Sequence, residues 1–299
     1  MSIMTQRRPR KALRSKLDFV RFVVPALFLY LLFFIVPLLH TIYYSFTDWN
    51  GIARSRHFNG FENYIQIWTD KLFISSLKFT LSYALIYTIA VNVAALALAL
   101  LLTRSIKSKT ALRAVIFTPF LFNDVTVGFL WQFLLGRFMT GLYTETNLSI
   151  FGISWLSNEN LVMYSIIFVK MWQAMGYFMV IYIAGLQLIP KEPLEAAVID
   201  GATGWKQITR ITIPLLFPTM AICVFLSITD ALHMFPLLMT LTGGGPGHAS
   251  ESVSLYIYNT AFNNQQMGYA SALAVVLAFI VLIITYFQLK VFRSKEVSM

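Results

Sequence analysis

Six long apolar runs, separated by polar segments, dominate the pattern of this 299-residue chain. A helix that crosses a bilayer needs about 20 consecutive, mostly apolar residues, and each run reaches or exceeds that length. The runs predict six membrane-spanning helices, at residues 22–41, 76–102, 113–135, 161–187, 212–241 and 268–290. The expected fold class is therefore all-α and polytopic.

The polar segment between the fourth and fifth runs has an order of its own. Pro193 suits the first turn of a helix, where its missing N–H costs nothing, and Leu194 and Ala197 follow at helical spacing. Gly201 suits the left-handed conformation that ends a helix. A second short amphipathic run covers 205–211. We expect a helix-turn-helix of about 20 residues, which is longer than most connections.

Composition supports a membrane protein. Hydrophobic residues make up 58% of the chain and charged residues 12%, against about 25% charged in a typical soluble domain. Mean hydropathy is +0.69, so one soluble core is excluded. Cys223 is the single cysteine, which excludes a disulfide within the chain. No cysteine–histidine group has the spacing of a metal site, so we expect no metal.

The positions of the Lys and Arg residues along the chain predict its orientation in the membrane, which the net charge of +10 does not. Cytoplasmic loops carry an excess of Lys and Arg. Seventeen of the 23 basic residues lie in the tail before the first run, in 103–113, in 188–211 and in the C-terminal tail. Both termini and the 188–211 loop are therefore predicted to be cytoplasmic. A signal peptide is the alternative for the first run, but that run is too long and lacks a cleavage site.

The spans and loops divide the chain into four expected parts. The first is a basic cytoplasmic tail, and the second is the first transmembrane helix with its external loop. The third is a core of five transmembrane helices that includes the 188–211 loop, and the fourth is a second tail. Their boundaries are 1–21, 22–75, 76–290 and 291–299.

Charged residues inside the apolar runs are candidates for function, because each costs about 2.5–3.5 kcal/mol on insertion scales. Lys170 lies in the fourth run, Asp230 in the fifth and Asp124 in the third. Two sets of residues at i, i+3, i+7 spacing predict two polar helix faces. They are Lys170, Gln173 and Tyr177 on the fourth helix and Ser227, Asp230 and Met234 on the fifth.

These faces suit a sugar, whose hydroxyls need amides, carboxylates and hydroxyls and whose C–H face needs an aromatic ring. The alternative is that Lys170 and Asp230 only neutralise each other and hold two helices together, since buried charges are usually paired. Both interpretations stay open. Asn92 is expected to hydrogen-bond between helices.

The 188–211 loop also resembles a known family. Residues 195–214 read Glu-Ala-Ala, three residues, Gly, nine residues, then Ile-Thr-Ile-Pro. This is similar to the signature loop of the membrane subunits of bacterial binding-protein-dependent ABC importers, with Ile213 where the family usually has Leu. Residues 241–246 and 256–262 resemble more narrowly the sugar permeases of the maltose and glycerol-3-phosphate group. Residues 46–49 and 61–64 are similar to the first permease of such pairs.

The resemblance implies an importer permease whose 188–211 loop sits in a cleft of a separate ATPase. It assigns that contact to Glu195, Ala196, Ala197, Asp200, Gly201, Ala202, Ile211 and Pro214. The implied partners are a second homologous permease, two copies of the ATPase, and an extracytoplasmic binding lipoprotein or periplasmic protein. The resemblance also implies a sugar substrate, a location in the lipid of a bacterial inner or plasma membrane, and ATP and Mg bound to the ATPase. No nucleic acid and no cofactor in this chain are expected. The alternative for the loop is an amphipathic segment lying on lipid headgroups.

A glycine-rich stretch after the fifth run is predicted to be a tight turn at the outer end of that helix. It consists of Gly243, Gly244, Gly245 and Pro246. A contribution to an outer gate and a plain turn are both open. The stretch is not a Walker A loop, because no Lys follows it. No nucleophile with a paired base is visible, so the chain is not expected to be an enzyme.

Three functions follow from these patterns. The favoured function is import of a sugar or oligosaccharide. The runner-up substrate is glycerol-3-phosphate or an acidic sugar, because Lys170 would pair with an anion. A secondary transporter or channel, with Lys170 and Asp230 as an ion or proton relay, is the alternative from another class.

Overall fold

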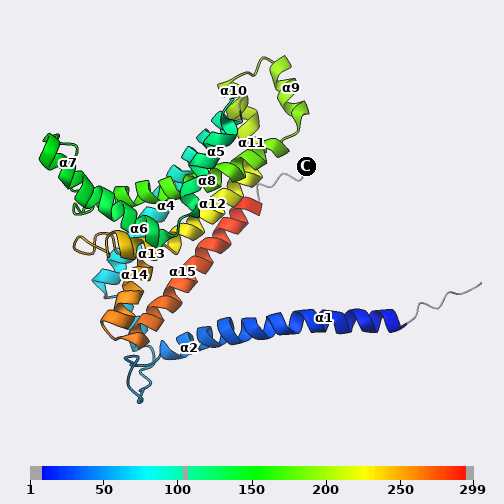
Figure 1. Cartoon of the computed structure of the whole chain (residues 1–299). Coiled ribbons are helices and arrows are strands. Elements are labelled where there is room, and N and C mark those ends of the chain that lie inside the picture. The colour runs from blue at the N-terminus through cyan, green and yellow to red at the C-terminus, as the bar shows by residue number, and fades with distance from the viewer. Residues whose placement is uncertain (1–8, 104–106, 294–299) are drawn as a thin grey trace, which may run out of the picture. The chain divides into compact units, whose positions relative to one another are not determined.

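Helices form nearly all of the structure of this chain (Figure 1). The computed structural model describes residues 9–103 and 107–293, so the expected basic tails fall partly outside the described residues, as does Arg104. Within the described ranges, the β structure is one isolated bridge between Thr47 and Phe58. The all-α prediction is confirmed.

The chain divides into two compact units. One contains residues up to Ile65 together with Thr260–Val275, and the other contains Gln66–Asn259 and the residues from Val276 onward. The first unit begins with α1 (Pro9–Tyr30), η1 (Leu31–Ile35) and α2 (Val36–Tyr44). Residues 19–44 form an apolar span of 26 residues, which confirms the first predicted crossing.

Hydrogen bonds organise the rest of the first unit. In α3 (Glu62–Ile67), the Asn63 amide donates to the carbonyl oxygens of Ser45 at 2.9 Å and Thr47 at 3.0 Å. The backbone N–H of Gly268 donates to the carbonyl of Trp49 at 2.7 Å. A Cβ on Gly268 would collide with the carbonyl oxygen of Thr47, so only glycine allows this close approach.

Three helices form the centre of the second unit: α4 (Lys71–Leu102), α8 (Val162–Leu188) and α12 (Phe217–Leu232). α4 begins at Lys71 because the Asp70 carboxylate caps it, accepting from the N–H groups of Leu72 and Phe73. Large side chains such as Tyr83 and Tyr182 are completely buried among these helices. The second and fourth predicted spans are confirmed.

The third predicted span, 113–135, is wrong as one continuous helix. The chain forms α5 (Lys109–Phe117), a 3₁₀ turn η2 (Thr118–Leu121) and then α6 (Asp124–Phe133), which continues through η3 (Leu134–Phe138) into α7 (Met139–Thr146). Pro119 cannot donate to the helix ladder, and the Asn123 side chain caps a new helix by accepting from the N–H of Val125. The apolar helix therefore runs from Asp124 to Thr146.

The fifth predicted span, 212–241, is also interrupted. A segment of α10 (Trp205–Gln207), η4 (Ile208–Thr212) and α11 (Ile213–Leu215) meets α12 at a bend of 72°. Pro218 has no N–H to continue the ladder across this bend. α12 ends at Leu232, and α13 (Pro236–Leu241) starts after three non-helical residues. The fifth predicted span is therefore not one continuous helix.

Two further helices and a π-helical turn complete the chain: α14 (Val253–Tyr258), η5 (Asn259–Asn263) and α15 (Met267–Arg293). The sixth predicted span is confirmed by the apolar stretch of 24 residues from Met267 to Lys290. Among the described residues, five helices are long and apolar enough to cross a membrane, and the bent pair makes six if it forms one span. The chain is a multi-pass membrane protein.

Candidate functional site

Three charged side chains meet in the second unit, each brought there by a different helix. Asp124 starts α6 directly after the break, Lys170 lies in the first half of α8, and Asp230 lies near the end of α12. The Lys170 ammonium is 3.1 Å from Oδ1 of Asp124 and 3.3 Å from Oδ1 of Asp230. We call these residues the charged triad. It holds one positive and two negative charges.

Neighbouring polar groups fix the two carboxylates of the charged triad. The Gln173 amide donates to Oδ1 of Asp124 at 2.9 Å and to the carbonyl of Phe122 at 3.0 Å. The Tyr87 hydroxyl donates to Oδ2 of Asp230 at 3.0 Å. The Lys170 side chain is only 7% exposed, whereas the carboxylate side chains are 29% and 39% exposed. The cation is thus enclosed, and its partners face open space.

That open space is a cavity of about 460 Å³, which we call the triad cavity. Besides the charged triad, Gln173 and Thr229 supply polar groups to its wall. Its aromatic wall includes Tyr177, whose ring stacks on Phe120 with centroids 4.5 Å apart. Carboxylates and hydroxyls beside flat aromatic surface suit a polyhydroxylated ligand, because they offer acceptors to its hydroxyls and a face to its C–H groups.

Two of the residues predicted for this site lie elsewhere. Ser227 is completely buried, and its hydroxyl accepts a 2.9 Å hydrogen bond from Asn92. Met234 lies beyond the end of α12, where its carbonyl accepts from the Ser252 hydroxyl at 3.0 Å. The predicted face of Ser227, Asp230 and Met234 does not form, because the helix ends before Met234.

The helix-to-helix bond predicted for Asn92 is confirmed. Besides its bond to Ser227 on α12, Asn92 on α4 accepts from the Tyr182 hydroxyl of α8 at 2.7 Å. One amide therefore links all three central helices, and it does not line the triad cavity.

Sequence reasoning missed two features of the triad. It paired Lys170 with Asp230 alone, whereas the structure adds Asp124. It also missed Tyr87, which looks like one of many aromatic residues in an apolar run. A Pro followed by Asn-Asp at 119–124 was an available signal, since that pattern marks a helix stop and a new capped start.

The 188–211 loop has the predicted helix-turn-helix form. α9 (Lys191–Ile199) places Pro193 in its first turn and ends before Gly201, whose φ is +75°. The N–H of Ala202 donates to the carbonyl of Ala197 at 2.8 Å, which closes the helix end. The Gln207 amide donates to the carbonyl of Leu194 at 3.2 Å, so the two limbs of the loop are joined.

The outer surface of this loop is unusually apolar. Ile199 is 86% exposed and Trp205 is 75% exposed. Glu195 and Asp200 are also exposed, whereas Ala197 is buried. The remaining residues predicted for ATPase contact, Ala196, Ala202, Ile211 and Pro214, lie in or beside the two limbs. Exposed large apolar side chains beside acidic groups are typical of a surface that binds another protein.

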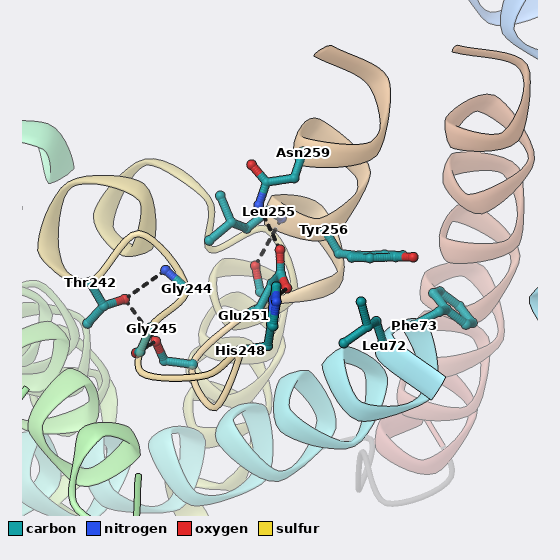
Figure 2. Close-up of polar contacts among 12 residues, drawn as sticks. Leu72, Phe73, Thr242, Gly244, Gly245, His248, Glu251, Leu255, Tyr256 and Asn259 are labelled. Atoms are coloured by element: carbon teal, nitrogen blue, oxygen red, sulfur yellow. Dashed lines mark hydrogen bonds and ion pairs between the residues drawn. The ribbon is translucent and has the colours of Figure 1, made fainter. Parts of the chain in front are cut away.

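The glycine-rich stretch forms the predicted turn (Figure 2). Gly243 and Gly244 have positive φ, and the Thr242 hydroxyl accepts from the N–H of Gly244 at 3.2 Å. Beside the turn, the buried Glu251 carboxylate accepts from the Asn259 amide at 2.7 Å and lies 2.5 Å from Nδ1 of His248. A role of Gly243–Pro246 in gating stays a prediction.

Comparison with known proteins agrees with this architecture. Residues 91–296 match the family model described as "Binding-protein-dependent transport system inner membrane component". A probable starch degradation products transport system permease protein, AmyD of Thermoanaerobacterium thermosulfurigenes, is 34% identical over 93% of this chain and 94% of its own length. The multiple sugar-binding transport system permease protein MsmF of Streptococcus mutans is 32% identical over 96% of this chain and 99% of its own.

A solved structure shares the fold. A chain in the crystal structure of a bacterial ABC transporter involved in import of the acidic polysaccharide alginate superposes with a TM-score of 0.81. It is 21% identical, and the match covers 95% of this chain and 98% of that one. The sequence match over most of the chain carries the assignment: this chain belongs to the family of inner membrane components of binding-protein-dependent transport systems.

Proposed function

We propose that this chain is the membrane permease subunit of an ATP-driven importer, and that its substrate is a neutral sugar or oligosaccharide. The sugar class rests on the similarity to permeases named for starch degradation products and multiple sugars. The triad cavity, with its carboxylates, amide and stacked rings, supplies the groups that such a substrate needs.

The charged triad carries the preference for a neutral substrate. Lys170 already contacts two carboxylates, so the cluster has a net charge of −1 when all three groups are ionised. An anion entering the cavity would meet this net negative charge at short range and would be repelled by it. Glycerol-3-phosphate and acidic sugars are therefore disfavoured.

The proposed assembly contains four other subunits. A second homologous permease completes the pathway, and two ATPase subunits, which carry ATP and Mg, bind at the 188–211 loops. An extracytoplasmic binding protein delivers the sugar to the opposite face. Both termini lie in the cytoplasm, as the distribution of Lys and Arg favours.

In the proposed cycle, closure of the ATPases moves the 188–211 loop. The loop has two hydrogen-bonded limbs and is continuous with α8 and α12, so its movement reaches the helices that hold Lys170 and Asp230. Coupling of this kind needs a contiguous element with two positions. The cavity then faces alternately outward and inward.

Uptake by the complete transport system tests the proposal. Cells that lack this chain should lose uptake of one neutral oligosaccharide and keep uptake of glycerol-3-phosphate, and the chain supplied in trans should restore the loss. Preferential loss of an anionic substrate would contradict the neutral assignment. Solute movement down an ion gradient in vesicles that carry this chain alone would contradict the importer assignment.

A further inference from the structure

A second cavity lies beside the 188–211 loop, away from the charged triad. It has a volume of about 350 Å³, and we call it the Arg113 cavity. Its wall combines basic and polar side chains with aliphatic ones. The polar set is Thr103, Lys109, Arg113, Gln187 and Thr212, and the aliphatic set includes Leu100, Leu186 and Leu194.

Arg113 has an unfilled hydrogen-bonding group. One terminal nitrogen of its guanidinium donates to the carbonyl of Leu102 at 2.7 Å, at the end of α4. Its Nε is shielded from solvent and has no hydrogen-bond partner among the described residues. A shielded donor without a partner is unfavourable, so the Arg113 side chain has hydrogen-bonding capacity that the described residues do not use.

The positive charge of this cavity is also unbalanced. Lys109 lies one turn before Arg113 on α5, and neither forms an ion pair with a carboxylate within residues 9–103 and 107–293. α5 starts at Lys109 without a side-chain cap on its first N–H groups, and a helix N-terminus favours an anion. Lys109 and Arg113 therefore line the same cavity, next to the uncapped start of α5 and without a counter-charge from the described residues.

The position of the cavity indicates the source of the anion. α4 has 32 residues, or about 48 Å at 1.5 Å per residue, which exceeds the roughly 30 Å of a bilayer core. At least one end of α4 therefore reaches the headgroup layer, and the basic residues Lys109 and Arg113 at the Leu102 end favour that end. Basic pockets between transmembrane helices are typical binding sites for anionic headgroups.

We propose that the Arg113 cavity binds the phosphate group of an anionic phospholipid. The Arg113 fork and Lys109 hold the phosphate, Thr103 and Gln187 take the neighbouring oxygens, and the aliphatic wall contacts the start of the acyl chains. Leu194 of α9 and Thr212, which ends η4 directly after the 188–211 loop, also line the cavity, so the lipid contacts α9 and η4. Lipid composition thereby affects how firmly this loop is held, whatever substrate the permease carries.

Native mass spectrometry of the purified full-length chain tests the proposal. The probes are phosphatidylglycerol, phosphatidylcholine and inorganic phosphate. We expect the protein to retain phosphatidylglycerol in preference to phosphatidylcholine, and millimolar inorganic phosphate should not displace it. Lys109→Ala should weaken retention about fivefold. Phosphatidylglycerol should also slow amide hydrogen exchange in residues 191–215.

Matched variants separate a site from general surface charge. Lys107 is exposed on the same turn and does not line the cavity, so Lys107→Ala should leave retention unchanged. Arg113→Lys keeps the positive charge but removes the planar fork, and should also weaken retention. Three outcomes would overturn the lipid site. Lys107→Ala would lose as much lipid retention as Lys109→Ala, Lys109→Ala would retain as much lipid as the unchanged chain, or inorganic phosphate would displace the lipid fully. None of these outcomes depends on transport.

Discussion

At the scale of single residues, the charged triad shows one cation on α8 that pairs with carboxylates on two other helices, α6 and α12. Lys170 lies within 3.3 Å of both carboxylates and is itself almost enclosed, so each negative charge depends on it. Removal of one partner from a buried pair costs about 3–5 kcal/mol because the other charge is left uncompensated. The carboxylates here are partly exposed, which reduces that cost.

We predict that Lys170→Met lowers the free energy of unfolding by about 2 kcal/mol and only weakens uptake of a neutral sugar, whereas it would abolish uptake of an anion. The double variant Lys170→Met/Asp124→Asn removes one of the stranded charges and should recover part of the stability. Thermal unfolding of the purified chain measures the stability of the single and the double variant. If the double variant were no more stable than the single one, charge balance would not explain the role of Lys170.

Glycines decide how closely the helices approach one another. A Cβ on Gly176 of α8 would collide with the backbone of Ile116 and Phe117, whereas a Cβ on Gly136 of η3 would meet nothing within 4 Å. We predict that Gly176→Ala destabilises the chain by about 1–3 kcal/mol. Gly136→Ala is the matched control and should be neutral or slightly stabilising. Similar melting temperatures for the two variants would contradict this packing.

At the scale of elements, the 188–211 loop depends on Gly201. Its φ of +75° is unfavourable for other residues, although a Cβ added at this position would meet no atom within 4 Å. A replacement is therefore strained by about 1–2 kcal/mol without a steric clash. Only the local loop geometry should change.

We predict that Gly201→Asp greatly reduces uptake and stimulated ATP hydrolysis in the complete transport system, while the two permeases still assemble. Gly201→Asn is the matched control, because Asn adopts the left-handed conformation more readily than most residues and, unlike Asp, adds no charge. Normal uptake by Gly201→Asp would show that the loop does not couple the subunits. Co-purification of the two permeases checks that the variant still assembles.

At the scale of the whole molecule, the orientation in the membrane can be measured with single cysteines. In a Cys223→Ala background, Glu195→Cys and Asn158→Cys lie at opposite ends of α8. We predict that a membrane-impermeant maleimide added to intact cells labels Asn158→Cys and not Glu195→Cys, because basic loops stay in the cytoplasm. The reverse pattern would invert the proposed topology.

The membrane class, four of the six spans and the form of the 188–211 loop could all be predicted from the amino-acid sequence. These follow from local rules: apolar length, helical spacing, and Gly201 as a helix end. Family membership also leaves its pattern in the sequence, at 195–214.

The breaks in the third and fifth spans, and the identity of the charges that meet, became known from the three-dimensional structure. Prolines occur both inside and at the ends of membrane helices, so Pro119 and Pro218 alone did not reveal breaks after residues 117 and 215. The contacts of Lys170 with Asp124 and Asp230 join residues 46 and 60 positions apart. Such pairs form through packing of α6, α8 and α12, and the spacing along one helix carries no information about its neighbours.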